Sequence, residues 1–194
     1  MENSTEINLK INSDTVLLFD MDGTLIDTDF ANFLSYQEAI KSVTQSESEI
    51  QYVPNERFNR TILKQVVSNL TEEKLIQIIK QKEMNYNKYL SQTKLNKAIS
   101  DILIQYSKSN KTVLVTNCRK NRAVLTLEYH KLLDKFNYLF FKEIDDKANR
   151  VNKYKNALNN LSISAQVVVA FENEKVEIED AIFAGIPINN IISL

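Results

Sequence analysis

The sequence has few of the residues that build covalent cross-links, tight turns and metal centres. Its 194 residues include one cysteine, one histidine, two prolines, two glycines and no tryptophan. A single cysteine, Cys118, excludes an intramolecular disulfide. No apolar stretch approaches the roughly 20 residues of a membrane span, and residues 1–12 have no apolar signal-peptide core. The net charge of −1 argues against general affinity for nucleic acid or an anionic membrane. We therefore expect a cytoplasmic protein with neither kind of partner.

Apolar residues are plentiful by comparison: 43% of the chain is hydrophobic, enough to bury a core. The abundance of Lys, Asn and Ile suggests a bacterial source. Short apolar runs are expected to be strands, and these are Thr15–Phe19, Thr112–Thr116, Tyr138–Phe141, Val167–Phe171 and Asn190–Ser193. Helical patterns fill the gaps between them. This alternation predicts an α/β fold, in which a Rossmann-like parallel sheet carries helices on both faces.

One long segment interrupts the alternation of strands and helices. Between residues 28 and 94 no convincing strand is found, and helices are expected over Phe30–Val43, Glu56–Leu70 and Thr71 to about Leu90. Thr71 is a good N-cap, because acidic residues follow it in the first turn. We therefore expect a core domain of residues 1–27 and 95–194, and an inserted all-helical domain of residues 28–94.

Two aspartates, one residue apart, directly follow the first apolar run, in Asp20-Met21-Asp22-Gly23-Thr24-Leu25. In open α/β sheets, ligands bind at the carboxyl ends of strands. Two neighbouring carboxylates repel each other unless a cation or a proton neutralises one of them, and Mg²⁺ suits such oxygen ligands. Gly23 allows a close backbone turn whose N–H groups can bind an anion. One aspartate could attack a substrate while its neighbour transfers the proton.

The stretch Phe19-Asp20-Met21-Asp22-Gly23-Thr24-Leu25-Ile26-Asp27-Thr28-Asp29 resembles the first motif of the haloacid dehalogenase-like (HAD) phosphohydrolase superfamily. The resemblance covers residues 15–194, and the helical insertion looks like the small helical cap (C1 type) that many members carry. It implies a Mg²⁺-dependent phosphatase that hydrolyses a small phosphorylated metabolite through an aspartyl-phosphate.

Two further elements of this family are recognisable after the insertion. Thr116 ends the second long strand and resembles the Ser or Thr of the second motif, which with Asn117 would hold a phosphoryl oxygen. The third element is a lysine that offsets the negative charge of aspartate and phosphate. Lys147 and Lys153 compete for this role. We favour Lys153, because Asn152 would cap the helix that begins there and would hold the lysine more rigidly.

The fourth element is the stretch from Phe171 to Pro187, which resembles the family's Phe-Glu-Asp-Ser…Ala-Gly-Ile-Pro segment. Asn173 stands where most members have aspartate. Its amide oxygen can still bind Mg²⁺ but carries no charge, so the metal should bind more weakly. Glu172 is expected to supply the acid in its place, with Glu177 as a helper.

The resemblance assigns a role to each of these residues. Asp20 would be the nucleophile, and Asp22 would protonate the leaving group and then activate water. The expected catalytic residues are Asp20, Asp22, Thr116 and Lys153. The expected substrate contacts are Gly23, Asn117 and Arg119. The expected Mg²⁺ ligands are Asp20, the Asp22 carbonyl, Glu172 and Asn173.

Two alternatives to a phosphatase stay open at this stage. A phosphomutase shares the same motifs, and a non-catalytic binding protein could keep the same fold. Asn173 favours the binding protein, whereas the intact pair of Asp20 and Asp22 argues against it. A set of cap residues at helical spacing, Arg57, Arg60 and Lys64, could meet an anionic substrate, although a solvated face is the commoner outcome.

Overall fold

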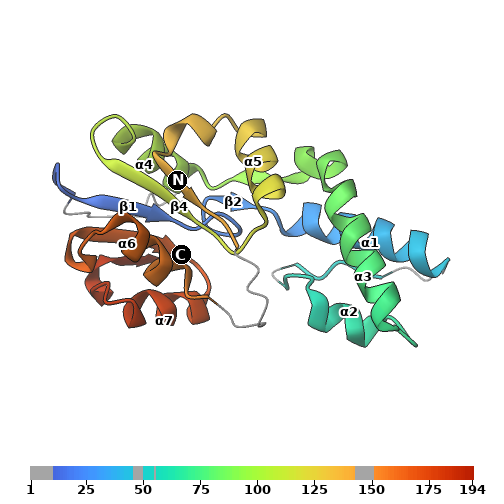
Figure 1. The fold of residues 1–194 in the computed structure, drawn as a ribbon. Coiled ribbons are helices and arrows are strands. Elements are labelled where there is room, and N and C mark those ends of the chain that lie inside the picture. Colours follow the sequence, from blue (N-terminus) through green and yellow to red (C-terminus); the bar gives the residue numbers. More distant parts are fainter. Residues whose placement is uncertain (1–10, 46–49, 55, 143–150) are drawn as a thin grey trace.

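The computed structural model describes residues 11–45, 50–54, 56–142 and 151–194. A five-stranded parallel sheet forms the centre of the core, and a group of helices projects beyond one end of it (Figure 1). The strand order is β5-β4-β1-β6-β7. The strands are β1 (Val16–Phe19), β4 (Lys111–Val115), β5 (Tyr138–Phe140), β6 (Val168–Glu172) and β7 (Ile191–Ser193).

The central strand β1 is buried on both faces, as its unbroken apolar sequence requires. Successive side chains point to opposite faces, so Leu17 and Phe19 join one apolar cluster while Val16 and Leu18 join another. Phe19 also stacks on Phe171 of the neighbouring β6, with ring centroids 4.6 Å apart. Burial on both faces fixes the register of β1, and with it the position of the acidic turn that follows.

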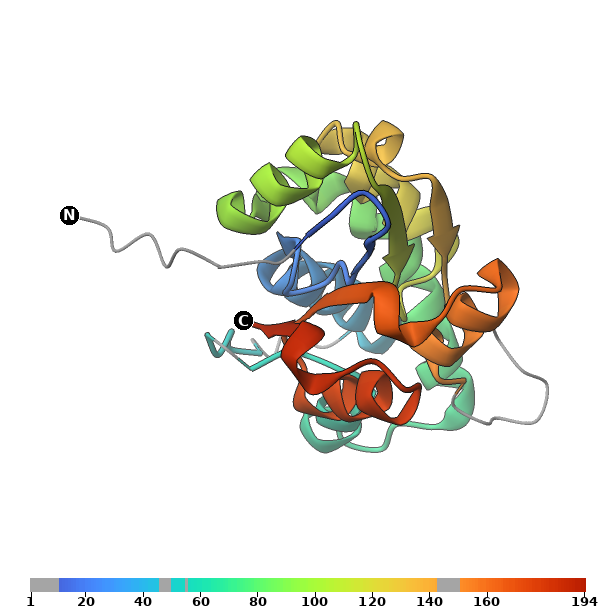
Figure 2. The same ribbon diagram turned by 90° about the vertical axis from the view of Figure 1, so that its left-hand side faces the viewer.

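Helices cover both faces of the sheet. Figures 1 and 2 show α4 (Lys97–Tyr106) and α5 (Lys120–Tyr129) on one side, and α6 (Lys153–Leu161) and α7 (Lys175–Phe183) on the other. Short 3-10 turns complete the core, and they are η2 (Leu133–Lys135), η3 (Ala165–Val167) and η4 (Ile188–Asn190). The predicted Rossmann-like α/β fold is confirmed.

The inserted helices form a cap with an apolar centre of its own. They are α1 (Asp29–Thr44), α2 (Arg60–Val66), α3 (Glu72–Asn85) and the 3-10 helix η1 (Tyr86–Gln92). Phe33, Leu63 and Ile78 meet in this centre, which is separate from the two clusters of the sheet. The chain enters and leaves the cap through a short antiparallel pair, β2 (Ile26–Asp27) with β3 (Lys94–Leu95). The domain boundaries at 27/28 and 94/95 stay a prediction.

The second cap helix is shorter than the expected Glu56–Leu70. It begins at Arg60, because the side chain of Asn59 accepts hydrogen bonds from the N–H groups of Thr61 and Ile62. It ends at Val66, where Val67 turns to an extended conformation. The expected cap at Thr71 is confirmed, since its hydroxyl accepts the N–H of Lys74 at 3.3 Å.

None of the helices in the described residues combines the length and the apolar character needed to cross a membrane.

The apolar centre of the cap predicts that substitutions at two isoleucines of α3 have different effects on the free energy of unfolding. Ile78 is fully buried, whereas Ile76 on the same helix is 64% exposed. We expect Ile78→Ala to lower the free energy of unfolding by about 2–5 kcal/mol, because it leaves a cavity in the cap. Ile76→Ala should stay within about 0.5 kcal/mol of the native protein. Chemical denaturation followed by circular dichroism measures both; equal losses would contradict the assignment of the cap centre.

Candidate active site

Three neighbouring parallel strands end at the same edge of the sheet and bring polar side chains together there. Asp20 follows β1, Thr116 follows β4, and Glu172 is the last residue of β6. The pairing of Phe19 with both Leu114 and Phe171 sets these strand ends level. The sequence placed all three residues at strand ends, and the structure brings them together around a cavity of about 200 Å³.

Lys153 connects two of these strand ends. Its Nζ lies 2.6 Å from Asp20 Oδ1 and 2.7 Å from Glu172 Oε2, and its side chain is only 6% exposed. Lys153 is the first residue of α6, where the Asn152 side chain accepts the N–H of Lys155. The capped helix start expected from the sequence is therefore present. Its competitor, Lys147, lies outside the described residues.

Glu172 is held by four hydrogen-bond donors. Oε2 accepts from Lys153 and from the Tyr154 hydroxyl at 2.7 Å each. Oε1 accepts the N–H groups of Asn173 and Glu174 at 2.9 and 3.0 Å. This carboxylate is fully buried, and its bonding fixes the position of the Lys153 ammonium.

Asp20 is buried in a region with more negative than positive charge. Burial raises its pKa to about 7, and the charge of Glu172 adds to the rise while Lys153 opposes it. Glu174 and Glu177 also line the cavity. The walls of this cavity carry five carboxylates, which include Asp22, against Lys153 and the two arginines, so a surplus of carboxylates remains.

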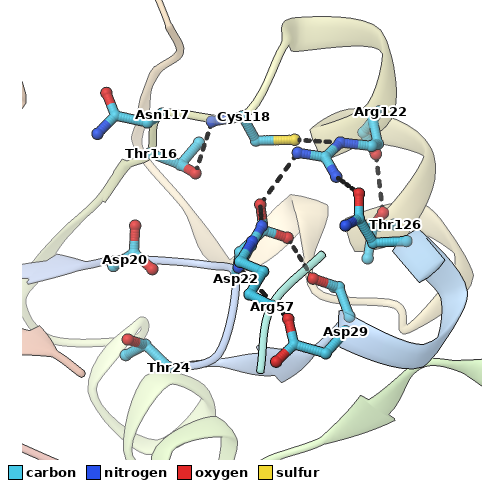
Figure 3. Close-up of polar contacts among 12 residues, drawn as sticks. Asp20, Asp22, Thr24, Asp29, Arg57, Thr116, Asn117, Cys118, Arg122 and Thr126 are labelled. Carbon is cyan, nitrogen blue, oxygen red and sulfur yellow. Dashed lines mark hydrogen bonds and ion pairs between the residues drawn. The ribbon is translucent and has the colours of Figure 1, made fainter. Parts of the chain in front are cut away.

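Asp22 has the opposite environment (Figure 3). Its Oδ2 lies 2.8 Å from Arg57 Nη2 and 3.1 Å from Arg122 Nη2, and its Oδ1 accepts the Thr28 hydroxyl at 2.6 Å. Burial alone would raise the pKa of Asp22, but the two guanidinium groups hold it well below its usual range. The carboxylate is therefore ionised in this arrangement.

Arg122 is a site residue that sequence reasoning missed. It is a buried arginine on α5, and its other nitrogens donate to Cys118 Sγ at 3.0 Å and to Asn32 Oδ1 of the cap at 3.3 Å. The signal available in the sequence was an arginine on a helix face that also carries Ala123 and Thr126. Thr28 was also missed. Arg57 was expected on a cap helix, but it precedes α2 and reaches into the site.

The acidic turn makes a close contact with the loop after β6. Gly23 has a φ of +87°, and a Cβ there would lie 2.6 Å from Asn173 Nδ2. Thr24 donates its hydroxyl to Asn173 Oδ1 at 2.9 Å. The backbone conformation therefore favours glycine at this position, and a larger residue would also displace the side chain of Asn173, which lies against the turn that carries the aspartates.

The loop after β4 places its residues in different surroundings. Thr116 lines the cavity and accepts the N–H of Cys118 on its hydroxyl at 3.1 Å. Asn117 also lines the cavity and donates to Glu177 Oε1 at 2.9 Å. Arg119, expected as a substrate contact, lines a second and larger cavity next to this one. Burial raises the pKa of Cys118 to about 12, so this thiol stays protonated.

The chemistry of the site fits Mg²⁺. No group of three or more His, Cys, Asp or Glu side chains converges as a metal site within the part of the chain that the structure describes. Mg²⁺, however, is commonly held by one or two carboxylates together with water and substrate phosphate. The surplus of carboxylates around Asp20 provides the negative charge for such a cation.

Comparisons with known proteins show the family and the fold of this chain. The sequence matches the family model described as haloacid dehalogenase-like hydrolase over residues 17–191. No curated protein matches it significantly. A predicted phosphoglycolate phosphatase from Haemophilus somnus has a similar structure, with a TM-score of 0.72 and 17% identity, covering 94% of this chain and 85% of that one.

Two further solved structures share the fold. A protein named for β-phosphoglucomutase, from Thermotoga maritima, has a TM-score of 0.64 and 22% identity, covering 91% of this chain and 83% of its own. CbbY from Rhodobacter sphaeroides, solved with phosphate, has a TM-score of 0.68 and 15% identity, covering 92% of this chain and 84% of its own.

The unequal surroundings of the two aspartates predict two separate titrations. In metal-free protein, we expect Asp20 to titrate near pH 7 and Asp22 to stay ionised far below pH 4. Added Mg²⁺ should lower the pKa of Asp20, because a nearby cation favours the carboxylate. Carboxyl ¹³C NMR measures both groups, with Asp20→Asn and Asp22→Asn to assign the signals. An Asp20 that titrates near pH 4 without metal would contradict this description.

The two arginines on Asp22 predict unequal losses of stability. We expect Arg122→Gln to cost about 3–5 kcal/mol at pH 7, because it weakens a buried charge pair and removes the bonds to Cys118 and Asn32. Arg57→Gln should cost less, because the Arg57 side chain is 28% exposed. Because the pKa of Asp22 is lower in the folded protein than in the unfolded one, its ionised form stabilises the fold above the unfolded-state pKa of about 4. This stabilisation is lost progressively as the pH falls below that pKa.

The difference in the free energy of unfolding between native protein and Arg122→Gln should therefore become smaller as the pH falls below about 4. Urea denaturation at several pH values measures this difference. A difference that does not change with pH would show that Arg122 stabilises the fold through packing alone.

Proposed function

This chain belongs to the haloacid dehalogenase-like hydrolases, and we propose that it is a Mg²⁺-dependent phosphatase of a small phosphorylated metabolite. The observation that carries the proposal is the buried Asp20 carboxylate at the end of β1, bonded to Lys153 at 2.6 Å. An aspartate in this position can attack a phosphoryl group, and the buried ammonium can offset the charge of the incoming phosphate.

The reaction would take place in two displacements at phosphorus. An oxygen of Asp20 forms a bond to phosphorus while the bond to the leaving-group oxygen breaks, which gives an aspartyl-phosphate and an alcohol once that oxygen gains a proton. Water then attacks the aspartyl-phosphate, releases inorganic phosphate and restores Asp20. Thr116 and Asn117 at the end of β4 would hold the phosphoryl oxygens. The N–H of Gly23, expected as a substrate contact, donates instead to the carbonyl of Ile26 at 2.8 Å within the turn.

Asp22 is proposed to move the proton in both displacements. In the arrangement described it is an ionised carboxylate, but the contacts with Arg57 and Arg122 keep its proton affinity low, so it is a weak base while both contacts are in place. To protonate a leaving group it must first take up a proton, so it must lose at least one of its arginine contacts. Arg57 comes from the proposed cap domain of residues 28–94, so movement of the cap would change the proton affinity of Asp22.

The proposed Mg²⁺ would be held by the Asp20 carboxylate and the main-chain carbonyl of Asp22, with the side-chain oxygen of Asn173 joining them if it gave up the Thr24 hydroxyl that it accepts in this structure. When bound, it would polarise the phosphoryl oxygens and offset their charge. Both oxygens of Glu172 already accept hydrogen bonds, one of them from Lys153. This favours a role in which Glu172 positions Lys153 and does not itself bind the metal. Because Asn173 brings no charge, the metal should bind more weakly than at an aspartate.

Two alternative functions can be told apart by what they do to a phosphate ester. The similarity to a protein named for β-phosphoglucomutase keeps a phosphomutase in view, and this would release an isomeric sugar phosphate rather than inorganic phosphate. A binding protein would bind phosphate esters without any turnover. If Asn173→Asp created activity that the native protein lacks, the binding protein would be supported.

The nucleophile assignment predicts the effect of one amide substitution. We expect native protein to hydrolyse p-nitrophenyl phosphate with Mg²⁺ and to stop when the metal is chelated. Asp20→Asn should lower turnover by roughly 10⁴-fold or more, because an amide cannot attack phosphorus. Release of p-nitrophenol measures this directly, and intact-protein mass spectrometry after acid quenching measures the phosphorylated aspartate.

Asp14→Asn is the matched control, since Asp14 is an exposed aspartate shortly before the same strand. It should keep native turnover. Equal activity in native protein and Asp20→Asn would exclude Asp20 as the nucleophile.

A further inference from the structure

The cavity next to the proposed catalytic site is much larger than the catalytic cavity itself. It measures about 750 Å³, within the range of small-molecule sites, whereas the cavity around Asp20 measures about 200 Å³. Its walls come from α3 of the cap and from the start of α5 in the core. Arg122 lines both cavities, and the loop from Asn117 to Arg119 also runs from one to the other. The two cavities therefore adjoin, and the larger one is the neighbouring space for the remainder of a molecule whose phosphate lies beside Asp20.

One part of this larger cavity is cationic. The basic residues on its walls, apart from Arg122, are Arg60, Lys80, Arg119, Lys120 and Lys142. None of these five forms an ion pair with an acidic group in the described ranges, which end at residue 142 and resume at 151. Among the described residues, the one acid on the walls is Glu83, whose Oε1 lies 3.2 Å from Lys82 Nζ. The walls therefore carry positive charge that an anion could neutralise.

Arg119 and Lys142 lie at the centre of this charge. The N–H of Lys142 donates to the carbonyl of Cys118 at 3.0 Å, which fixes the lysine next to the loop that carries Arg119. Partial burial lowers the pKa of Lys142, and neighbouring positive charges lower it further. These charges belong to Arg60, Arg119 and Arg122, while the nearby carboxylate of Glu177 partly offsets them. Like charges held this close favour an anion among them.

Another part of the cavity is apolar. Ile76 and Met84 of α3 are 64% and 56% exposed, and Leu125 of α5 is 40% exposed. All three line the cavity. Exposed apolar side chains that gather on the walls of a cavity, from both cap and core, indicate a binding surface for an apolar group.

We propose that this cavity binds the leaving group of the substrate, and that this group combines an apolar, ring-sized surface with a second anionic group. The inference rests on the proposed phosphatase function and specifies its substrate class. The second anion lies among Arg119, Lys142 and Arg60, and the apolar surface lies against Leu125, Met84 and Ile76. A two-carbon acid would reach the cations but would leave the apolar walls exposed to water.

Three stable phosphonates test the two features separately. Benzylphosphonate has the ring alone, phosphonoacetate has the second anion alone, and para-carboxybenzylphosphonate has both. Titration calorimetry with Mg²⁺ present should show that the compound with both features binds about tenfold or more tightly than either of the others. Equal binding by para-carboxybenzylphosphonate and benzylphosphonate would overturn the anion site. Equal binding by para-carboxybenzylphosphonate and phosphonoacetate would overturn the apolar site.

Variants locate the two features within the cavity. Replacing both Arg119 and Lys142 by Gln should abolish most of the affinity that the carboxylate adds. This added affinity is measured as the ratio of the affinities for para-carboxybenzylphosphonate and benzylphosphonate. Leu125→Ala should reduce the affinity that the ring adds, measured as the ratio of the affinities for para-carboxybenzylphosphonate and phosphonoacetate. Lys74→Gln is the matched control, because Lys74 is an exposed lysine of α3 that does not line the cavity, and it should change neither ratio. If Lys74→Gln changed the carboxylate ratio as much as the double variant, the anion site would be overturned.

Binding and turnover are read separately, so the two proposals can fail independently. Selective binding of para-carboxybenzylphosphonate without hydrolysis of any phosphate ester would support the cavity assignment and contradict the phosphatase. Hydrolysis without the expected selectivity would support the phosphatase and overturn the substrate class. A dimer in analytical ultracentrifugation that Ile76→Asp dissociates would show that a second copy covers the apolar walls instead, and would also overturn it.

Discussion

The buried ammonium of Lys153 between two buried carboxylates is the interaction on which the rest of the site depends. Asp20 and Glu172 end neighbouring strands, so their charges are held close together and could not share this space without a cation between them. The four hydrogen bonds on Glu172 keep the ammonium in place. The sheet register, the capped start of α6 and the low solvent exposure of the strand ends all support this one contact.

Charge is distributed unequally on the two sides of the acidic turn. Around Asp20 carboxylates outnumber ammonium groups, and this side suits a divalent cation. Around Asp22 two guanidinium groups meet the carboxylates of Asp22 and Asp29, and Arg122 continues this side into the cationic wall of the larger cavity. Only Met21 separates the two aspartates, yet their proton affinities are shifted in opposite directions. A phosphate ester would lie across this boundary, with its charge facing both sets of groups.

The parts of the site that could be predicted from sequence are those encoded locally. Apolar runs that end in acid or threonine placed Asp20 and Thr116 at strand ends, and an Asn cap favoured Lys153 over Lys147. The Arg122 contacts could not be found this way, because its partners Asp22 and Asn32 lie 100 and 90 positions away. The start of α2 was placed too early at Glu56, because the pattern of the sequence did not single out Asn59 as the residue whose side chain caps this helix.

The cap is attached to the core in two physically different ways. The β2–β3 pair joins it through backbone hydrogen bonds, which almost any sequence could form. Arg57 and Asn32 join it through side chains that complete the charge balance around Asp22. A cap taken from a relative would keep the first connection and lose the second unless it carried matching groups at both positions. In evolution, exchange of the whole cap is therefore constrained by electrostatic compatibility with the core, in addition to any demand that the substrate makes on the exposed face of α3.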